Sequence, residues 1–213
     1  MAIDEAIPLD DPTPSLAPTA ERLLEAARAV LRRDGFERLT FEAIASESGE
    51  TQSLIRYHFG DKAGLIRTLV ESELFLESDD VKAAVADARP GPERRRALLR
   101  KCRDIATAKD ELRNYLELLP RLARDESLRP LLKTLVDWYV CLNAWALSPD
   151  PERDRLEDLE PLATLTYAMA DGMALRSQAD PNADIGPAFD LWEAMVETYM
   201  ATWPSTQGPD RDT

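Results

Sequence analysis

The residues best suited to chemistry lie in segment 40–65, and the chemistry they suit is the recognition of nucleic acid. If a helix begins near residue 51, its pitch of about 100° per residue turns Ser53, Arg56 and Tyr57 to one exposed side. That side would present a hydroxyl, a guanidinium and a phenol. Such a helix can enter the major groove of DNA with its N-terminal end first, so that polar side chains reach the base edges. The segment therefore predicts a DNA-reading helix.

A shorter helix and a glycine turn must precede this helix to position it. Phe41, Ile44 and Ala45 are spaced at i, i+3 and i+4, which is typical of a helix with one apolar face. Thr40 is predicted to cap the N-terminus of that helix. Gly49 follows the last apolar position, where a helix can end through a positive φ at the least cost with glycine.

The DNA-reading helix itself is predicted from residue 51 to about residue 59. It would bury Ile55 and Phe59 against the first helix, because these two residues lie one turn apart on the same face. Asp61 is predicted to cap a third helix. The apolar residues of the third helix are Leu65, Ile66, Leu69 and Val70.

The run GETQSLIRYHFGDK, residues 49–62, resembles the recognition segment of the tetracycline-repressor (TetR) family of bacterial regulators. Residues 23–35 resemble the first helix of that family, and residues 39–45 resemble its second helix. The resemblance covers residues 19–67, less than a quarter of the chain. It implies an all-α fold, in which an N-terminal three-helix DNA-binding module with a helix-turn-helix precedes a larger helical domain for ligand binding and dimerisation.

The resemblance also implies which residues contact DNA. Gln52, Ser53 and Leu54 would face the bases, since glutamine can pair with adenine and an apolar side chain can meet a thymine methyl group. Contacts to phosphate would fix the register of the helix without reading sequence. The predicted DNA-binding set is Thr40, Thr51, Gln52, Ser53, Leu54, Arg56, Tyr57, His58 and Lys62, with phosphate contacts from Thr40, Tyr57, His58 and Lys62. The alternative for His58 is a packed or solvated side chain without a role.

Three residues depart from the family pattern. Glu50 stands where the family usually has a small apolar residue, and Glu42 stands at a position that contacts DNA in some members. Two carboxylates near the groove would repel phosphate unless they are neutralised or turned away. We expect Glu50 to complement the N-terminal dipole of the recognition helix. Arg56, where tyrosine is common, could read guanine or hold a phosphate.

The charge of the chain is unevenly distributed. The formal net charge is −14, which by itself argues against a nucleic-acid partner. Residues 19–67 nevertheless hold eight basic and eight acidic groups, whereas residues 1–18 hold four acidic groups and no basic one. The predicted DNA-binding module is therefore the least acidic part of the chain.

Proline-rich breaks divide the chain, and no strand-like alternation appears. The predicted domains are an acidic, Pro-rich mobile arm at 1–18, the helix-turn-helix domain at 19–66, a helical effector-binding and dimerisation domain at 67–203, and a flexible tail at 204–213. Thr19 is the predicted cap of the first helix. Helices are predicted at 19–34, 62–77, 92–108, 110–124, 127–147, 154–179 and 186–203. The basic run at 93–103 is predicted to be a solvated helix face that forms salt bridges with acidic residues, and the alternative is contact with phosphate or an acidic ligand.

No feature of the sequence predicts secretion, a membrane span, a cofactor or a metal. The N-terminal segment is acidic and lacks a secretory signal, and no run of about 18 apolar residues is present. Cys102 and Cys141 have no metal or redox spacing, and we expect them to be buried thiols in a reducing cytoplasm. The single histidine has no partner histidine for a metal site.

The larger domain holds candidates for two further surfaces. The candidates for an effector pocket are Tyr115, Leu118, Leu119, Trp138, Cys141, Leu142 and Trp145. The candidates for a homodimer interface are Leu165, Met169, Gly172, Met173, Leu191, Met195 and Tyr199. In both cases the alternative is internal core packing, because a core produces the same helical spacing.

These observations predict a homodimeric, DNA-binding transcription regulator in the bacterial cytoplasm. The mechanism that we expect is repression from a palindromic operator and release by an unknown small-molecule effector. The alternative is a helical interaction protein of the same fold that has lost specific DNA binding. An enzyme is not expected, because the sequence has no Gly-rich phosphate loop, no nucleophile motif and only one histidine.

Overall fold

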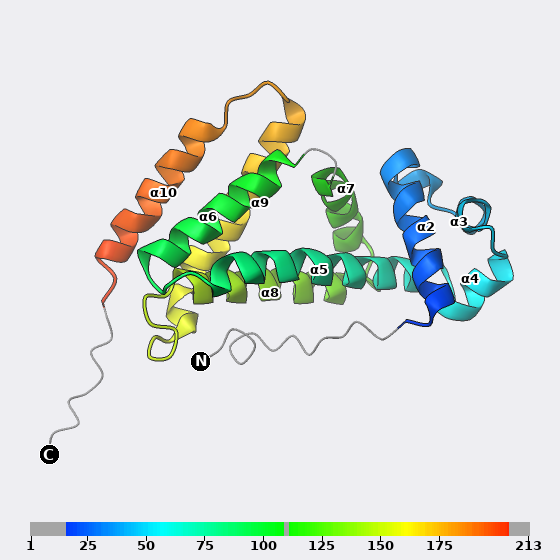
Figure 1. Cartoon of the computed structure of the whole chain (residues 1–213), viewed down its shortest axis with the longest axis horizontal. Coiled ribbons are helices and arrows are strands. Elements are labelled where there is room, and N and C mark those ends of the chain that lie inside the picture. The colour runs from blue at the N-terminus through cyan, green and yellow to red at the C-terminus, as the bar shows by residue number, and fades with distance from the viewer. Residues whose placement is uncertain (1–15, 109–110, 205–213) are drawn as a thin grey trace, which may run out of the picture. The chain divides into compact units, whose positions relative to one another are not determined.

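The computed structural model describes residues 16–108 and 111–204, apart from the side chains of residues 73–80, 111–115 and 117. In this part of the chain all regular secondary structure is helical (Figure 1), which confirms the all-α prediction. None of the helices searched there is both long enough and apolar enough to span a bilayer. The predicted acidic arm lies outside the described residues except for its last three, and so does the predicted tail after Pro204.

The helices follow the predicted order, and all but two of them begin and end within a few residues of the predicted bounds. Their bounds are α2 Pro18–Asp34, η1 Phe36–Arg38, α3 Phe41–Ser48, α4 Gln52–Phe59, α5 Lys62–Ala86, α6 Pro92–Thr107, α7 Glu111–Arg124, α8 Arg129–Leu147, η2 Leu156–Leu159, α9 Glu160–Ala179 and α10 Gly186–Ala201, where η denotes a 3₁₀ helix.

The predicted end of the third helix was wrong. Helix α5 continues past residue 77 to Ala86. Val81 and Val85, one helical turn apart, are both buried, and no glycine or proline interrupts the chain before Pro90. The packing of these two valines therefore extends the helix beyond the acidic residues that precede them in the chain.

The predicted start of the helix at 154–179 was also wrong. A 3₁₀ turn, η2, comes first, and α9 begins at Glu160. Pro161 explains the difference, because proline has no N–H group and is well tolerated only in the first turn of a helix. A helix that began at residue 154 would have carried this proline in its interior.

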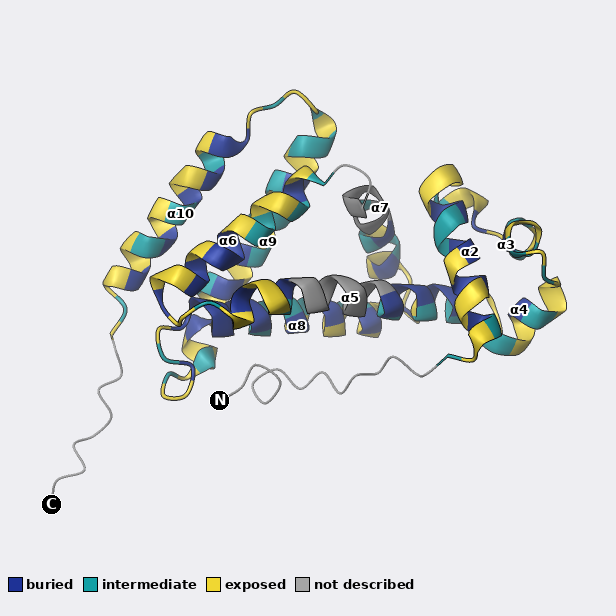
Figure 2. Cartoon of the chain, viewed as in Figure 1, coloured by how far each residue is buried: buried dark blue, intermediate teal, exposed yellow. Residues whose placement is uncertain are grey.

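The first compact unit contains described residues 16–79 and 111–135. Helices α2, α3 and α4 pack on one another around a continuous core, which α5 and α7 complete. In Figure 2 the ribbon of α2 carries both buried residues, in dark blue, and exposed residues, in yellow. This core includes Leu23, Ala27, Val30, Ile44, Ile55, Leu65, Leu69, Leu118 and Leu122. A segment beyond residue 110 thus shares a core with the N-terminal helices.

Helix α2 starts differently from the prediction. Its N-cap is Ala17, which makes no side-chain capping bond, and Pro18 occupies the first turn. The prediction of Thr19 as the cap was therefore wrong, because proline fixes the helical φ one residue earlier. The hydroxyl of Thr19 instead accepts a hydrogen bond from Arg22.

The second compact unit contains described residues 80–108 and 136–204, in which α6 packs against α9 and α10. Two arginines of the basic run are buried here, so the predicted solvation is wrong for Arg94 and Arg95, whereas the predicted salt bridge to an acidic residue is confirmed for Arg95. Arg95 donates two hydrogen bonds to the carboxylate of Glu197, at 2.8 and 2.7 Å. The guanidinium of Arg94 lies 3.8 Å from the ring centroid of Trp145. An ion pair and a cation–π contact accommodate these buried charges.

Candidate nucleic-acid interface

Helix α3 and the turn after it have the predicted geometry. The hydroxyl of Thr40 accepts a hydrogen bond from the backbone N–H of Ala43 at 3.1 Å, which confirms the cap. Ile44 is fully buried. Gly49 has φ 72° and ψ 12°, a left-handed conformation that glycine adopts most readily. These three features determine where α3 ends and in which direction the chain continues.

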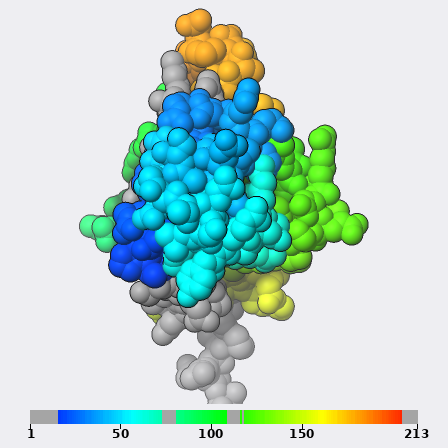
Figure 3. All heavy atoms as spheres, turned by 90° about the vertical axis from the view of Figure 1, so that its right-hand side faces the viewer, coloured from blue at the N-terminus to red at the C-terminus, as the bar shows by residue number. Residues whose placement is uncertain are grey.

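Helix α4 separates an apolar side from a polar side, as predicted. Thr51 caps it by accepting a hydrogen bond from the N–H of Leu54 at 3.3 Å. Ile55 and Phe59 are buried, whereas Tyr57 is 81% exposed. The exposed side also carries Gln52, Ser53 and Arg56. Figure 3 shows that α3 and α4, in cyan, form the surface of this unit that faces the viewer.

The remaining predicted DNA contacts differ in exposure. Thr40 and Lys62 are exposed, and His58 is half-buried with its ring edge-on to Tyr57, at 5.1 Å between centroids. Leu54 is half-buried and packs against the core, so only part of its side chain is available to a base.

Arg121 of α7, which sequence reasoning did not single out, contacts two residues of η1 in the same unit. The guanidinium of Arg121 lies 4.2 Å from the ring centroid of Phe36, and Lys62 approaches the same ring at 4.9 Å. Arg121 also pairs with Glu37 at 2.6 Å. Because 84 residues separate Arg121 from Glu37 in the chain, no local pattern could have predicted this contact.

The connection between α4 and α5 depends on a second glycine that sequence reasoning missed. Asp61 caps α5 by accepting a hydrogen bond from the N–H of Gly64 at 2.8 Å, as predicted. A Cβ atom on Gly64 would lie 2.1 Å from the carbonyl oxygen of Phe59. The end of α4 can approach the start of α5 this closely only because residue 64 has no side chain.

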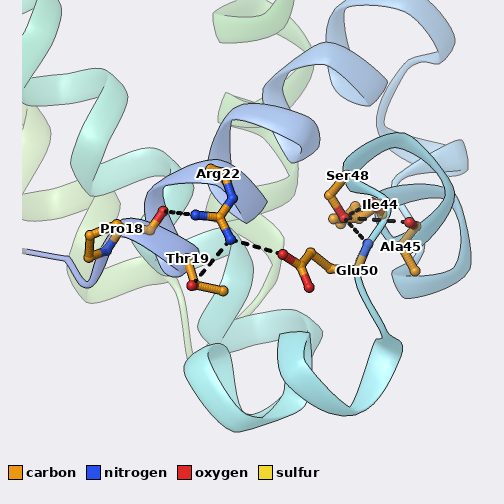
Figure 4. Close-up of polar contacts among 7 residues, drawn as sticks. All are labelled: Pro18, Thr19, Arg22, Ile44, Ala45, Ser48 and Glu50. Carbon is orange, nitrogen blue, oxygen red and sulfur yellow. Dashed lines mark hydrogen bonds and ion pairs between the residues drawn. The ribbon is translucent and has the colours of Figure 1, made fainter.

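The two carboxylates that departed from the family pattern have different surroundings. Glu50 forms an ion pair with Arg22 of α2 at 2.9 Å (Figure 4). Its hydrogen-bonded partner is an arginine, which neutralises the carboxylate. That Glu50 also complements the N-terminal dipole of α4 stays a prediction. Glu42 is exposed in the first turn of α3 and has no ion pair within the described ranges.

The sequence comparison identifies this module. Residues 23–69 match the family described as "Bacterial regulatory proteins, tetR family". Residues 23–69 are a TetR-family regulatory module. The match supports a DNA-binding transcription regulator, a class of protein that is not enzymatic. Comparison with curated protein sequences gives no match.

Solved structures share the fold of the chain along most of its length. A proposed transcriptional regulator from Pseudomonas aeruginosa PAO1 is similar with a TM-score of 0.70 and 21% identity, over 90% of this chain and 95% of that one. A proposed regulator from Saccharomonospora viridis in complex with choline has a TM-score of 0.65 and 21% identity, over 86% and 95%. The multidrug binding protein EbrR complexed with imidazole has a TM-score of 0.66 and 19% identity, over 87% and 91%.

The predicted effector-pocket residues are divided between the two compact units. Leu118 is buried in the core of the first unit, Leu119 is half-buried, and the side chain of Tyr115 lies outside the described residues. The second unit holds the candidates of α8. Trp138, Leu142 and Trp145 are buried there, and the two indole N–H groups donate to no described acceptor.

Cys141, the remaining candidate on α8, lines a cavity of about 380 Å³ in the second unit. Asp137, Glu157 and Glu160 line the same cavity and make it acidic. Neither cysteine of the chain forms a disulfide, and both are half-buried, whereas we expected buried thiols. Burial, and to a lesser extent Asp137, raises the pKa of the Cys141 thiol. Burial, with Asp171 nearby, raises the pKa of the Cys102 thiol to about 12.

The predicted dimer residues lie on α9 and α10, and several of them are exposed. Leu165, Leu191, Met195 and Tyr199 have exposed fractions of 62%, 63%, 58% and 46%. With Met169 they line an apolar groove of about 720 Å³. Met173 is half-buried, and Gly172 is exposed with open space around the position of a Cβ atom. Internal core packing therefore does not account for the four exposed side chains.

Proposed function

We propose that this protein is a homodimeric repressor of the TetR family that binds a palindromic operator and leaves it when a small molecule binds. The observation that carries the proposal is that α4 has one buried apolar side and one exposed polar side. Its buried Ile55 and Phe59 fix the helix on the module, and its exposed Gln52, Ser53 and Arg56 leave hydrogen-bonding groups free for base edges. A repressor of this kind would act in the bacterial cytoplasm, where its operator is.

Within this proposal, the residues of the module divide between reading and positioning. Gln52, Ser53 and Arg56 would read bases, and the exposed part of Leu54 would meet a thymine methyl group. The exposed Tyr57 and the polar groups around it would contact phosphate. Those positioning residues are Thr40, Thr51, Tyr57, His58 and Lys62.

A second copy of the chain is the proposed occupant of the groove between α9 and α10. Exposed leucines, a methionine and a tyrosine line this groove, and large apolar side chains of this kind are typical of the centre of homodimer interfaces. A twofold dimer would also supply the second recognition helix that a palindromic site requires.

An effector is proposed to bind the second unit at the cavity beside Cys141. The acidic lining from Asp137, Glu157 and Glu160 favours a positively charged small molecule. Two proteins of similar fold support the proposal, since one is in complex with choline and the other with imidazole. If the effector weakens operator binding, linkage requires that the operator weakens effector binding by the same factor.

Selection of DNA from a random pool tests the proposed function. The full-length chain is incubated with random-sequence duplexes, and the bound fraction is amplified and sequenced over several rounds. We expect a palindromic consensus, with an affinity that falls steeply as the salt concentration rises. A chain that enriches no sequence and binds no duplex at low salt contradicts the proposal and favours the alternative, a helical interaction protein that has lost DNA binding.

A further inference from the structure

Arg22 of α2 and Glu50, which precedes α4, form an ion pair within the DNA-binding module (Figure 4). Arg22 Nη2 lies 2.9 Å from Glu50 Oε1 and also donates to the hydroxyl of Thr19 at 3.3 Å. Arg22 Nη1 donates to the carbonyl oxygen of Pro18 at 3.4 Å. Three acceptors thus fix the guanidinium of Arg22. This guanidinium in turn fixes the side chain of Glu50.

The backbone of Glu50 is held as well. Its N–H group donates to Ser48 Oγ at 3.3 Å, and the Ser48 hydroxyl donates to the carbonyl oxygen of Ile44 at 2.7 Å. The next residue, Thr51, caps α4. The side chain and the backbone of Glu50 therefore both fix the chain immediately before the recognition helix begins.

The charge of Glu50 matters for DNA more than for folding. Its side chain is 27% exposed and that of Arg22 is 58% exposed. Ion pairs of this exposure contribute little to stability, because water screens them and ordering the side chains costs entropy. Without Arg22, however, an unpaired carboxylate would stand two residues before Gln52, which is proposed to face the bases. That carboxylate would repel the phosphates of the bound duplex.

We propose that Arg22 is a positioning residue for DNA recognition. Its guanidinium fixes the Glu50 side chain and, through Glu50, the start of α4. Its positive charge also compensates the Glu50 carboxylate at the surface that would contact DNA. Arg22 thus acts through Glu50 and is not itself a phosphate ligand. The inference rests on the proposed DNA-binding function, because the consequence of the ion pair is measured as affinity for a duplex.

The test uses the full-length chain and the duplex that the wild-type chain selects from a random pool. Arg22→Ala is expected to weaken binding about tenfold at low salt, and less at high salt, because the uncovered carboxylate repels phosphate. Arg22→Ala combined with Glu50→Gln is expected to regain most of this loss, because the repelling charge has gone. Both variants lack Arg22, so a general effect of losing that side chain cannot produce the difference between them.

The Arg33–Glu47 pair provides a matched control. It joins α2 to α3 at 2.7 Å, with exposed fractions of 57% and 32%. Arg33→Ala, alone and combined with Glu47→Gln, is expected to leave the affinity for the selected duplex within about twofold of the wild type, since neither residue adjoins the start of α4. The thermal unfolding midpoint of Arg33→Ala is expected to fall by only a few degrees, as is that of Arg22→Ala.

Three results would overturn the inference while the proposed function stands. Arg22→Ala could bind the duplex as tightly as the wild type. The double variant could bind as weakly as Arg22→Ala, which would make Arg22 a direct phosphate ligand. Arg33→Ala could show the same loss, which would reduce both pairs to general stabilisation of the module. If the wild-type chain selects no duplex, the proposed function fails and the inference fails with it.

Discussion

The guanidinium of Arg56 lies over the ring of Phe41, with Cζ 5.1 Å from the ring centroid. The contact joins α4 to α3 and restricts an arginine whose side chain is otherwise exposed. A cation–π contact at an exposed site contributes about 0.5–1 kcal/mol, which is small for folding but enough to favour one orientation of the guanidinium. Arg56 is therefore pre-oriented before DNA arrives.

The first prediction concerns base reading by Arg56. Replacing it with alanine is expected to cost about 1–3 kcal/mol of specific binding, concentrated at one base pair of the operator, because guanine would lose two hydrogen bonds. Fluorescence anisotropy with operators substituted at each position measures this loss. Arg56→Lys separates the alternatives. It restores binding if Arg56 holds a phosphate, but not if the planar guanidinium reads a base. Unchanged affinity and base preference in Arg56→Ala would remove this residue from the reading set.

A second prediction concerns phosphate contact by Lys62, which is exposed at the start of α5. Lys62→Ala is expected to weaken binding to all duplexes by a similar factor, and to reduce the slope of log affinity against log salt by about 0.9, because one phosphate contact is lost. The measurement is a salt titration with the selected duplex and an unrelated one. Arg89→Ala is the control, since it removes one positive charge from the second unit at a side chain that is 90% exposed. The control should leave the slope unchanged.

The helix-turn-helix was predictable from the sequence because its determinants act over three or four residues. Thr40 and Thr51 each cap a helix by bonding to an N–H group three residues ahead, and Gly49 sets a single backbone angle. Ile55 and Phe59 are buried as their spacing predicts. Each of these features is a local property of the chain, so a reading of short segments was sufficient.

The ion pairs that neutralise charged residues of the module were not predictable, because they join residues far apart in the chain. Glu50 meets Arg22 across 28 residues, and Arg121 meets Glu37 across 84. Helical periodicity indicates which side of a helix is buried but not which opposite charge faces an exposed residue. The requirement for glycine at residue 64 was not predictable for a related reason. It arises because the carbonyl oxygen of Phe59, in the preceding helix, occupies the space that a Cβ atom would need.

The third prediction concerns that glycine. Intrinsic helix propensity alone predicts that Gly64→Ala stabilises α5 by about 1 kcal/mol. The structure predicts the opposite sign, because the new Cβ atom would lie 2.1 Å from the Phe59 carbonyl oxygen and the backbone would have to move. Overpacking of this kind costs about 1–3 kcal/mol. Urea unfolding at matched protein concentration decides the question, and a midpoint at or above that of the wild type would contradict the close approach.

The fourth prediction concerns dimerisation through α9 and α10. Leu191→Glu is expected to dissociate the proposed dimer, because it places a charge in the apolar groove. Leu175→Glu is a matched control, since Leu175 is 59% exposed, compared with 63% for Leu191, but does not line the groove. Sedimentation velocity across a concentration series measures the change. A wild-type chain that stays monomeric, or an equal effect of the two variants, would count against the groove as the interface.

The last prediction uses Cys141 as a reporter of the proposed effector cavity. Alkylation requires the thiolate, and burial together with Asp137 raises the pKa of this thiol. The rate of reaction with iodoacetamide is therefore expected to be low near neutral pH and to rise as the pH passes the ordinary range for thiols. Asp137→Asn removes one of the two causes and should increase the rate at about pH 8. Cys102, with its pKa raised to about 12, should react more slowly throughout.

Mass spectrometry of the alkylated peptides distinguishes the two thiols, and Cys141→Ser confirms the assignment. Choline, the ligand of one structure with a similar fold, is the first probe. If a cation occupies the cavity beside Asp137, Glu157 and Glu160, it shields the sulfur and slows alkylation of Cys141 while Cys102 is unaffected. Equal slowing of both thiols would indicate a general change in the fold. If no cationic small molecule slows the reaction of Cys141, the effector, if the protein has one, binds elsewhere.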